Sequence, residues 1–220
     1  MKIKICGIKS ADEARLVLDA SREFAQDFTR QNGTQARFGV DYLGMIFADS
    51  PRQVSVEMAR AVADAAHERG VRAVAVFGAQ SDEQILDIAG ACGAECVQVY
   101  RDLGAGTLAA LRAEGREIWR VYSVSDALPP LSAAFDMALF DTKGARLGGN
   151  GVAFDWQILR SLPSDFAGRF GIAGGLNAGN IARAAAFAPA LLDINSGVEG
   201  ANFAKDAGKI REILAILNEN

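Results

Sequence analysis

The stretch VRAVAVFGAQSDEQILDIAGACGAECVQVY, residues 71–100, holds two short apolar runs separated by a segment of helical period. The first run, VRAVAVF (71–77), is apolar on both faces, which is typical of a parallel strand covered on both sides. Ser81 followed by Gln84 is a capping-box pair, which marks a helix start between the two runs. The stretch therefore predicts a strand–helix–strand unit of a parallel sheet.

The same alternation continues along all 220 residues. The apolar runs that read as strands are 3–7, 41–47, 71–77, 95–100, 117–123, 135–140, 169–174 and 191–196. Eight strands, each followed by a helical segment, predict an α/β fold: one closed (β/α)8 TIM barrel over residues 1–220. An open doubly wound sheet is the alternative. It usually ends at about five or six strands, and no GxGxxG motif follows the first run.

Further helix signals lie along the chain. Ser10 with Glu13 is a second capping-box pair, and Gly70 and Gly115 are placed as helix stops. The last segment presents one apolar face that would cover the sheet, made of Ile210, Ile213, Leu214 and Leu217. Residues 21–39 are longer and more polar than the other connections. We expect them to extend the first helix and add a surface excursion.

Composition excludes several classes of protein. The 23 Lys and Arg against 27 Asp and Glu give a net charge of −4, which leaves no basic footprint for nucleic acid or an anionic membrane. MKIKICGIKS at the start does not read as a signal peptide, and no apolar run reaches the ~18 residues of a membrane span, so we expect a cytoplasmic protein.

Metal and disulfide chemistry are also disfavoured. His67 is the one histidine, and we expect it on a helix surface. Three cysteines do not suit a disulfide framework, and CGAEC lacks the second ligand pair of a structural zinc site. We expect Cys92 and Cys96 to be buried, one near a helix end and one in a strand, and we expect no metal and no cofactor.

In a barrel of this kind the active site lies at the carboxyl ends of the strands. Lys4 and Cys6 alternate with Ile3 and Ile5, so Lys4 and Cys6 point into the barrel if the isoleucines face the helices. A nearby ammonium favours a thiolate, so we expect a lowered thiol pKa. Asp141, at the end of the sixth strand, is placed as the opposing acid.

The turns after the last two strands predict a phosphate site. They contain Gly174-Gly175, followed by Asn177 as a helix N-cap candidate, and Ser196-Gly197. Glycines let backbone N–H groups approach an anion, and barrels of this class bind phosphate at these two loops. Tight turns without a ligand are the alternative. A base, an acid and a phosphate grip together indicate proton-transfer isomerisation of a sugar phosphate.

Several stretches resemble the phosphoribosylanthranilate isomerase family of tryptophan biosynthesis. They are KICGI (4–8), YLGMIFADSPRQVS (42–55), FDTK (140–143), GGNGVAFDW (148–156), AGGLNAGNI (173–181) and DINSGVEGANFAKD (193–206). The resemblance implies a metal-free and cofactor-free Amadori rearrangement. Its substrate would be N-(5-phosphoribosyl)anthranilate and its product 1-(2-carboxyphenylamino)-1-deoxyribulose 5-phosphate, at the third committed stage of the pathway.

The resemblance also implies roles for single residues. Asp141 would be the general acid and Cys6 the general base, with Lys4 in support. Arg52 would grip the anthranilate carboxylate, and Gln98 and Asp193 would support the substrate site. The glycines of the phosphate-binding loops would be Gly149, Gly151, Gly174 and Gly175, with Ser196 and Gly197 opposite them.

The fourth strand departs from the family pattern, because Tyr100 and Arg101 stand where histidine and glycine are expected. This departure leaves Asp141 and Cys6 in place, and it affects the expected shape of the pocket for the aromatic ring. Two other readings stay open: a phosphate-binding paralogue without catalysis, and another phosphosugar isomerase or epimerase on the same barrel. Metal-dependent epimerases need several histidines. We expect a small phosphorylated substrate, no nucleic-acid or membrane partner, and a monomer or homodimer.

Overall fold

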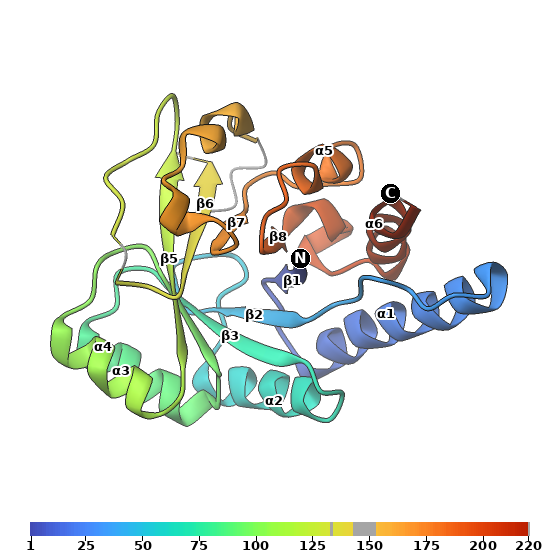
Figure 1. Ribbon diagram of the computed structural model, residues 1–220. Helices are drawn as coiled ribbons and strands as arrows, with labels where there is room; N and C mark the ends of the chain where they lie inside the picture. Colours follow the sequence, from blue (N-terminus) through green and yellow to red (C-terminus); the bar gives the residue numbers. More distant parts are fainter. Residues whose placement is uncertain (133, 143–152, 220) are drawn as a thin grey trace.

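The structure, a computed structural model, describes residues 1–132, 134–142 and 153–219. Eight parallel strands pair in sequence order, and β8 pairs with β1, so the sheet closes into a barrel (Figure 1). This confirms the predicted (β/α)8 barrel. The strands are β1 Lys2–Cys6, β2 Tyr42–Ile46, β3 Arg72–Phe77, β4 Cys96–Val99, β5 Glu117–Val124, β6 Met137–Thr142, β7 Phe170–Ile172 and β8 Leu191–Ile194.

The helices surround the barrel unevenly. Four long connections carry α1 Ala11–Asn32, α2 Val56–His67, α3 Asp82–Cys92 and α4 Ala105–Ala113, and the chain ends with α6 Ala207–Glu219 beside α1 (Figure 1). Helix α1 is 22 residues long and ends at Gly33, which has a left-handed φ of 71°. The expected extension of the first helix is therefore confirmed as far as Asn32.

The expectation that a helix follows every strand is wrong in the second half of the barrel. The described residues between β5 and β6 contain no helix, and Pro129-Pro130 lies in this connection. Proline lacks the N–H that a helix interior needs, so this connection cannot continue as a helix. After β6, the described residues form two short 3-10 helices, η1 Trp156–Ser161 and η2 Ser164–Phe166, and α5 Ile181–Ala185 is little more than one turn.

The strand side chains divide into two cores as the alternation predicted. Ile3 and Ile5 belong to the large core between the sheet and the helices. Cys6 belongs to the smaller core inside the barrel, where Trp119 lies edge-on to Tyr42 with ring centroids 5.0 Å apart. The apolar face of α6 is buried as expected. Lys4 is fully buried, so β1 carries an ammonium into the barrel.

The helix signals are confirmed with one correction. Ser81 and Gln84 form both hydrogen bonds of a capping box at α3. At α1, the Ser10 side chain accepts from the Glu13 N–H, but the Glu13 carboxylate accepts from the backbone N–H groups of Lys9 and Lys205 instead. Glu13 therefore ties the start of α1 to the loop after β8, a contact that local spacing does not reveal.

The two glycine stops differ. Gly115 follows the C-cap of α4 with a φ of 74°, whereas Gly70 lies two residues beyond Glu68, the C-cap of α2, with a φ of 69°. Both close the turn into the next strand, which left-handed glycines do without steric cost.

Candidate active site

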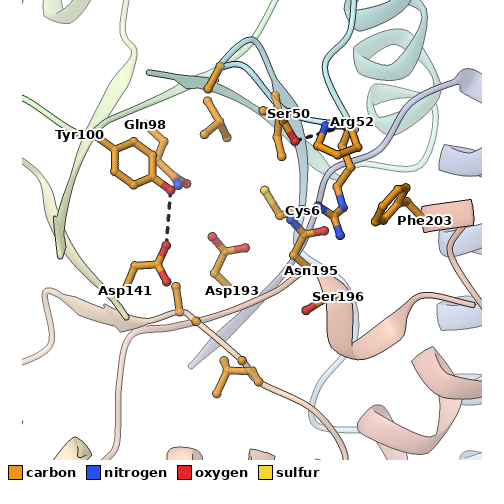
Figure 2. Close-up of a pocket in the computed structure, with 18 of the residues that line it drawn as sticks. Cys6, Ser50, Arg52, Gln98, Tyr100, Asp141, Asp193, Asn195, Ser196 and Phe203 are labelled. Carbon is orange, nitrogen blue, oxygen red and sulfur yellow. Dashed lines mark hydrogen bonds between the residues drawn. The ribbon is translucent and has the colours of Figure 1, made fainter. Parts of the chain in front are cut away.

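A pocket opens at the carboxyl ends of the strands, and Figure 2 shows the side chains that line it. Cys6 of β1, Gln98 of β4, Asp141 of β6 and Asp193 of β8 come from separate strands and converge there. The loop after β2 adds Arg52, and the loops after β7 and β8 add further polar groups, namely Gly174, Gly175, Asn195 and Ser196. Of the described residues that the sequence analysis selected as site residues, all but Lys4 and Gly197 line this pocket; Lys4 lies fully buried beneath it, and Gly197 lies in the loop after β8.

Lys4 is the centre of a buried network on the pocket floor. Its Nζ donates to Asp193 Oδ2 and Gln98 Oε1, both at 2.8 Å, and to Cys6 Sγ at 3.2 Å. Gly44 of β2 leaves the necessary room, because a Cβ there would lie 2.8 Å from both Cys6 Sγ and Lys4 Cε. Lys4 therefore links the thiol, the carboxylate and the amide at fixed distances.

The expected lowering of the Cys6 pKa is wrong. Burial raises the pKa of the Cys6 thiol, and the nearby Lys4 ammonium lowers it by less than burial raises it. The same network keeps Lys4 charged: burial alone would lower the lysine pKa, but the charge of Asp193 and the hydrogen bonds to Asp193 and Cys6 raise it above its ordinary value. Cys6 is therefore a protonated thiol at rest, and the Lys4 ammonium is in place to stabilise the thiolate when the proton leaves.

The Asp141 carboxyl also has a raised pKa. Burial raises its carboxyl pKa to about 6, and the charge of Asp193 adds to this. Its Oδ1 accepts from the backbone N–H of Thr142 at 2.8 Å, and its Oδ2 accepts from the Tyr100 hydroxyl at 3.4 Å. A carboxyl that holds a proton near neutral pH is suited to act as a general acid.

Asp193 has one oxygen without a partner. Its Oδ2 accepts from Lys4, whereas Oδ1 is buried and has no hydrogen-bond partner among the described residues. Asp193 lies beside Cys6 in the pocket, as Figure 2 shows. Because buried polar atoms are normally hydrogen-bonded, this oxygen is available for a donor that enters the pocket.

Arg52 is more engaged than the sequence indicated. Its Nε and Nη2 each donate to Glu199 across 2.6 Å, and Lys205 Nζ donates to the same carboxylate at 2.8 Å. Among the described residues, Arg52 Nη1 has no acceptor, so one side of the guanidinium is left for a ligand. Glu199 and Lys205 were not selected from the sequence, because the Arg52–Glu199 pair joins residues 147 positions apart in a chain of 220.

The turns after β7 and β8 interlock. Gly174 has a φ of 82°, and a Cβ there would lie 2.6 Å from Asp141 Oδ1. A Cβ on Gly197 would overlap the carbonyl oxygen of Leu176. Asn177 is not the cap of α5, because Asn180 precedes that helix; the Asn177 side chain accepts from the Gly179 N–H. The phosphate glycines Gly149 and Gly151 lie outside the described residues.

His67, Cys92 and Cys96 lie outside the pocket, where the sequence analysis expected them. His67 is exposed at the end of α2 and lies 2.9 Å from a Glu95 carboxylate oxygen. Cys92 and Cys96 are buried, at the end of α3 and the start of β4. In the part of the chain that the structure describes, no group of three or more His, Cys, Asp or Glu could hold a metal ion. No described helix is long and apolar enough to cross a membrane.

The fold and the site define a (β/α)8-barrel enzyme whose pocket gathers Cys6 and Asp141 from separate strand ends. Residues 6–215 match the family model described as N-(5′-phosphoribosyl)anthranilate isomerase. A relative of that name from Campylobacter jejuni is 34% identical over 220 residues, covering 100% of both chains. The chain belongs to this isomerase family.

Solved structures agree. The crystal structure of phosphoribosyl anthranilate isomerase from Thermus thermophilus has a TM-score of 0.78 and 25% identity, covering 100% of this chain and 99% of that one. Another structure has a TM-score of 0.73 and 24% identity, with full coverage of both chains. It is a structure of phosphoribosyl anthranilate isomerase in complex with reduced 1-(o-carboxyphenylamino)-1-deoxyribulose 5-phosphate.

Proposed function

We propose that this chain is an isomerase of tryptophan biosynthesis that converts N-(5′-phosphoribosyl)anthranilate to 1-(2-carboxyphenylamino)-1-deoxyribulose 5-phosphate, with Asp141 as the acid and Cys6 as the base. The observation that carries these two roles is their placement. They lie on opposite strands around one pocket, and each is buried next to a group that suits its task.

The chemistry is an internal proton transfer. Asp141 donates its proton to the ring oxygen of the ribose, the ring opens, and a Schiff base forms at the first carbon. In the reactive form the single proton of the pair lies on Asp141 and Cys6 is the thiolate, which then removes the proton from the second carbon. The resulting enolamine takes up a proton at its first carbon and becomes the aminoketone. Lys4 Nζ, 3.2 Å from Cys6 Sγ, stabilises the thiolate while it exists.

Other groups would bind the substrate. The unpartnered Asp193 Oδ1 is suited to a sugar hydroxyl close to the base. Arg52 Nη1 is suited to the anthranilate carboxylate, by a charge-assisted hydrogen bond. The turns at Gly174-Gly175 and Ser196-Gly197 would offer backbone N–H groups to the phosphate.

The activity test is an anthranilate-fluorescence assay with freshly prepared phosphoribosylanthranilate. We expect turnover by the wild-type protein and a loss of ~10²-fold or more in Cys6→Ser and in Asp141→Asn, the usual scale for a missing base or acid. Both variants should still bind inorganic phosphate. A near-normal rate in either variant would remove that residue from the mechanism, and phosphate binding without wild-type turnover would favour the non-catalytic paralogue.

A second test separates the two ends of the substrate. In Arg52→Ala, affinity for the reduced product analogue should fall at least about tenfold, because one charge-assisted contact is lost. Affinity for inorganic phosphate should not change. Because Arg52→Ala also removes one of the two cations that hold the buried Glu199 carboxylate and leaves it only Lys205, the double variant Arg52→Ala, Glu199→Ala is the matched control. Equal weakening of both ligands in both variants would make Arg52 a structural residue.

We propose a monomer or a homodimer, to be distinguished by size-exclusion chromatography with light scattering. We also propose the cytoplasm as its compartment. Cys6, Cys92 and Cys96 are all free thiols, as suits a reducing environment.

A further inference from the structure

A strained turn lies at the edge of the pocket, in the loop after β8. Residues 201–204 form it, and the Ala204 N–H donates to the Ala201 carbonyl at 3.2 Å. Its two central residues are left-handed: Asn202 has φ 56° and ψ 33°, and Phe203 has φ 57°. Two successive left-handed residues are the geometry of a type I′ turn, which favours Asn-Gly. Asparagine fits the first position, but phenylalanine at the second carries a steric cost that glycine would avoid.

The flanking residues hold this turn firmly. Glu199 and Lys205 form an antiparallel bridge, and the Gly200 N–H donates to the Ala204 carbonyl at 2.8 Å. Glu199 also accepts from the Arg52 side chain, and Lys205 donates to the same Glu199 carboxylate. The strained conformation is therefore imposed by the same short loop that positions the Arg52 guanidinium.

Burial does not compensate for the strain. The Phe203 side chain is among the few large apolar residues that stay exposed, at 45%. Its ring lies 4.8 Å from the Arg52 guanidinium carbon and forms part of the pocket wall (Figure 2). An exposed aromatic ring in an unfavourable backbone conformation at the rim of an active site is a candidate for ligand contact.

We propose that Phe203 is the stacking surface for the anthranilate ring of the substrate and a determinant of specificity for that ring. The inference rests on the proposed function and adds the residue that recognises the aromatic part. Arg52 would bind the carboxylate, and Phe203, in contact with Arg52, would pack against the ring that carries it. A planar ring with an ortho carboxylate matches this pair, whereas ribose 5-phosphate alone offers Phe203 nothing to stack on.

Four variants test this proposal. Phe203→Leu keeps an apolar side chain without a ring, Phe203→Tyr keeps the ring, and Phe203→Gly relieves the turn. Ala188→Gly is the matched control, because Ala188 is also left-handed, with φ 51°, but does not line the pocket. The measurements are KM and kcat, the Kd of the reduced product analogue and of ribose 5-phosphate, and the midpoint of thermal unfolding.

We expect Phe203→Gly and Ala188→Gly both to raise the unfolding midpoint. Only the Phe203→Gly and Phe203→Leu variants should raise KM and the analogue Kd, by about five- to tenfold, with kcat within about twofold. Phe203→Tyr should behave like the wild type, and the ribose 5-phosphate Kd should be unchanged throughout. Unchanged analogue binding in Phe203→Leu, or parallel weakening of analogue and ribose 5-phosphate, would overturn the proposal.

The binding measurements with the reduced product analogue also distinguish failure of this proposal from failure of the proposed function. If the wild type binds the analogue without turnover, the isomerase assignment fails, but a selective loss of analogue binding in Phe203→Leu still supports the stacking surface. If the wild type does not bind the analogue at all, the stacking surface is overturned whatever the assay shows.

Discussion

At the scale of single residues, Asp141 lowers the stability of the fold at neutral pH in order to supply the proposed acid. Its pKa is about 6 in the folded protein against an ordinary 3.8, so the fold disfavours the charged form. Stability from this group is complete below about pH 3.8 and is lost as the pH rises through about 6. Asp141→Asn should therefore be more stable than the wild type at pH 7, by up to roughly 3 kcal/mol, although it is inactive. Urea unfolding at pH 7 and at pH 3.5 tests this; a gain that is equal at both pH values would contradict it.

The same pair of residues predicts the pH dependence of kcat/KM. The proposed reaction needs one proton on the pair, with Asp141 protonated and Cys6 as thiolate. Asp141 has a pKa of about 6, and burial raises the Cys6 pKa above its ordinary 9.0. The profile should therefore be flat around pH 7–8, fall below about 6, and fall again only above the thiol pKa. An acidic limb near pH 4 would contradict this assignment.

Lys4 should be the most costly polar residue of the site to remove. Lys4→Met would leave the Asp193 carboxylate buried without its cation, so we expect a loss of ~3–5 kcal/mol. Adding Asp193→Asn removes the uncompensated charge and should recover a large part of that loss. Urea unfolding of both single variants and the double variant measures this coupling, and simple additivity would refute it.

How far the sequence reveals the site depends on distance along the chain. Alternation within β1 is a local property, and it placed Lys4 and Cys6 correctly inside the barrel. The predicted direction of the Cys6 pKa shift was wrong because burial of the thiol depends on every strand around it. The Arg52–Glu199 pair was missed for the same reason, since nothing local to either residue indicates the other.

At the scale of elements, the turns after β7 and β8 depend on each other. Gly197→Ala would drive a methyl group into the Leu176 carbonyl, so both turns must shift. We expect a loss of several kcal/mol and at least about tenfold weaker phosphate binding. Gly33→Ala is the control, because Gly33 is also left-handed, with φ 71°, but has open space around it. It should lose only about 1–2 kcal/mol and keep its phosphate affinity. Equal effects of the two variants on phosphate binding would show that the turns do not form that site.

The elements themselves were largely predictable, because a buried parallel strand is a short apolar run wherever it occurs. All eight runs became strands, and Ser81 with Gln84 starts a helix. The connections of the second half were less predictable. Apart from Pro129-Pro130, the chain between β5 and β6 carries no strong signal against a helix, and tertiary packing decides its shape.

At the scale of the whole molecule, the barrel has two unequal halves. Strand β2 pairs with β3 along its whole length, from Tyr42 to Ile46, and long helices cover this side. Strand β7 pairs with β8 at Gly171 and Ile172, next to short 3-10 helices and α5. Backbone amides of β7 should therefore exchange with deuterium faster than those of β2 and β3 in native-state experiments. Uniform protection around the barrel would contradict this.

This inequality has a consequence for heating. Cys6, the proposed base, and Lys4 lie on β1, beside the half with long helices. Asp141, the proposed acid, and the proposed phosphate turns lie in the half where the described connections form only short helices. As the temperature rises, the grip on the phosphate and the position of Asp141 should loosen while Cys6 and Lys4 are still held in place. The enzyme should then lose turnover reversibly at a temperature several degrees below the unfolding midpoint of the barrel. A bound phosphate compound should bring these two temperatures closer together, because it stabilises the weaker half.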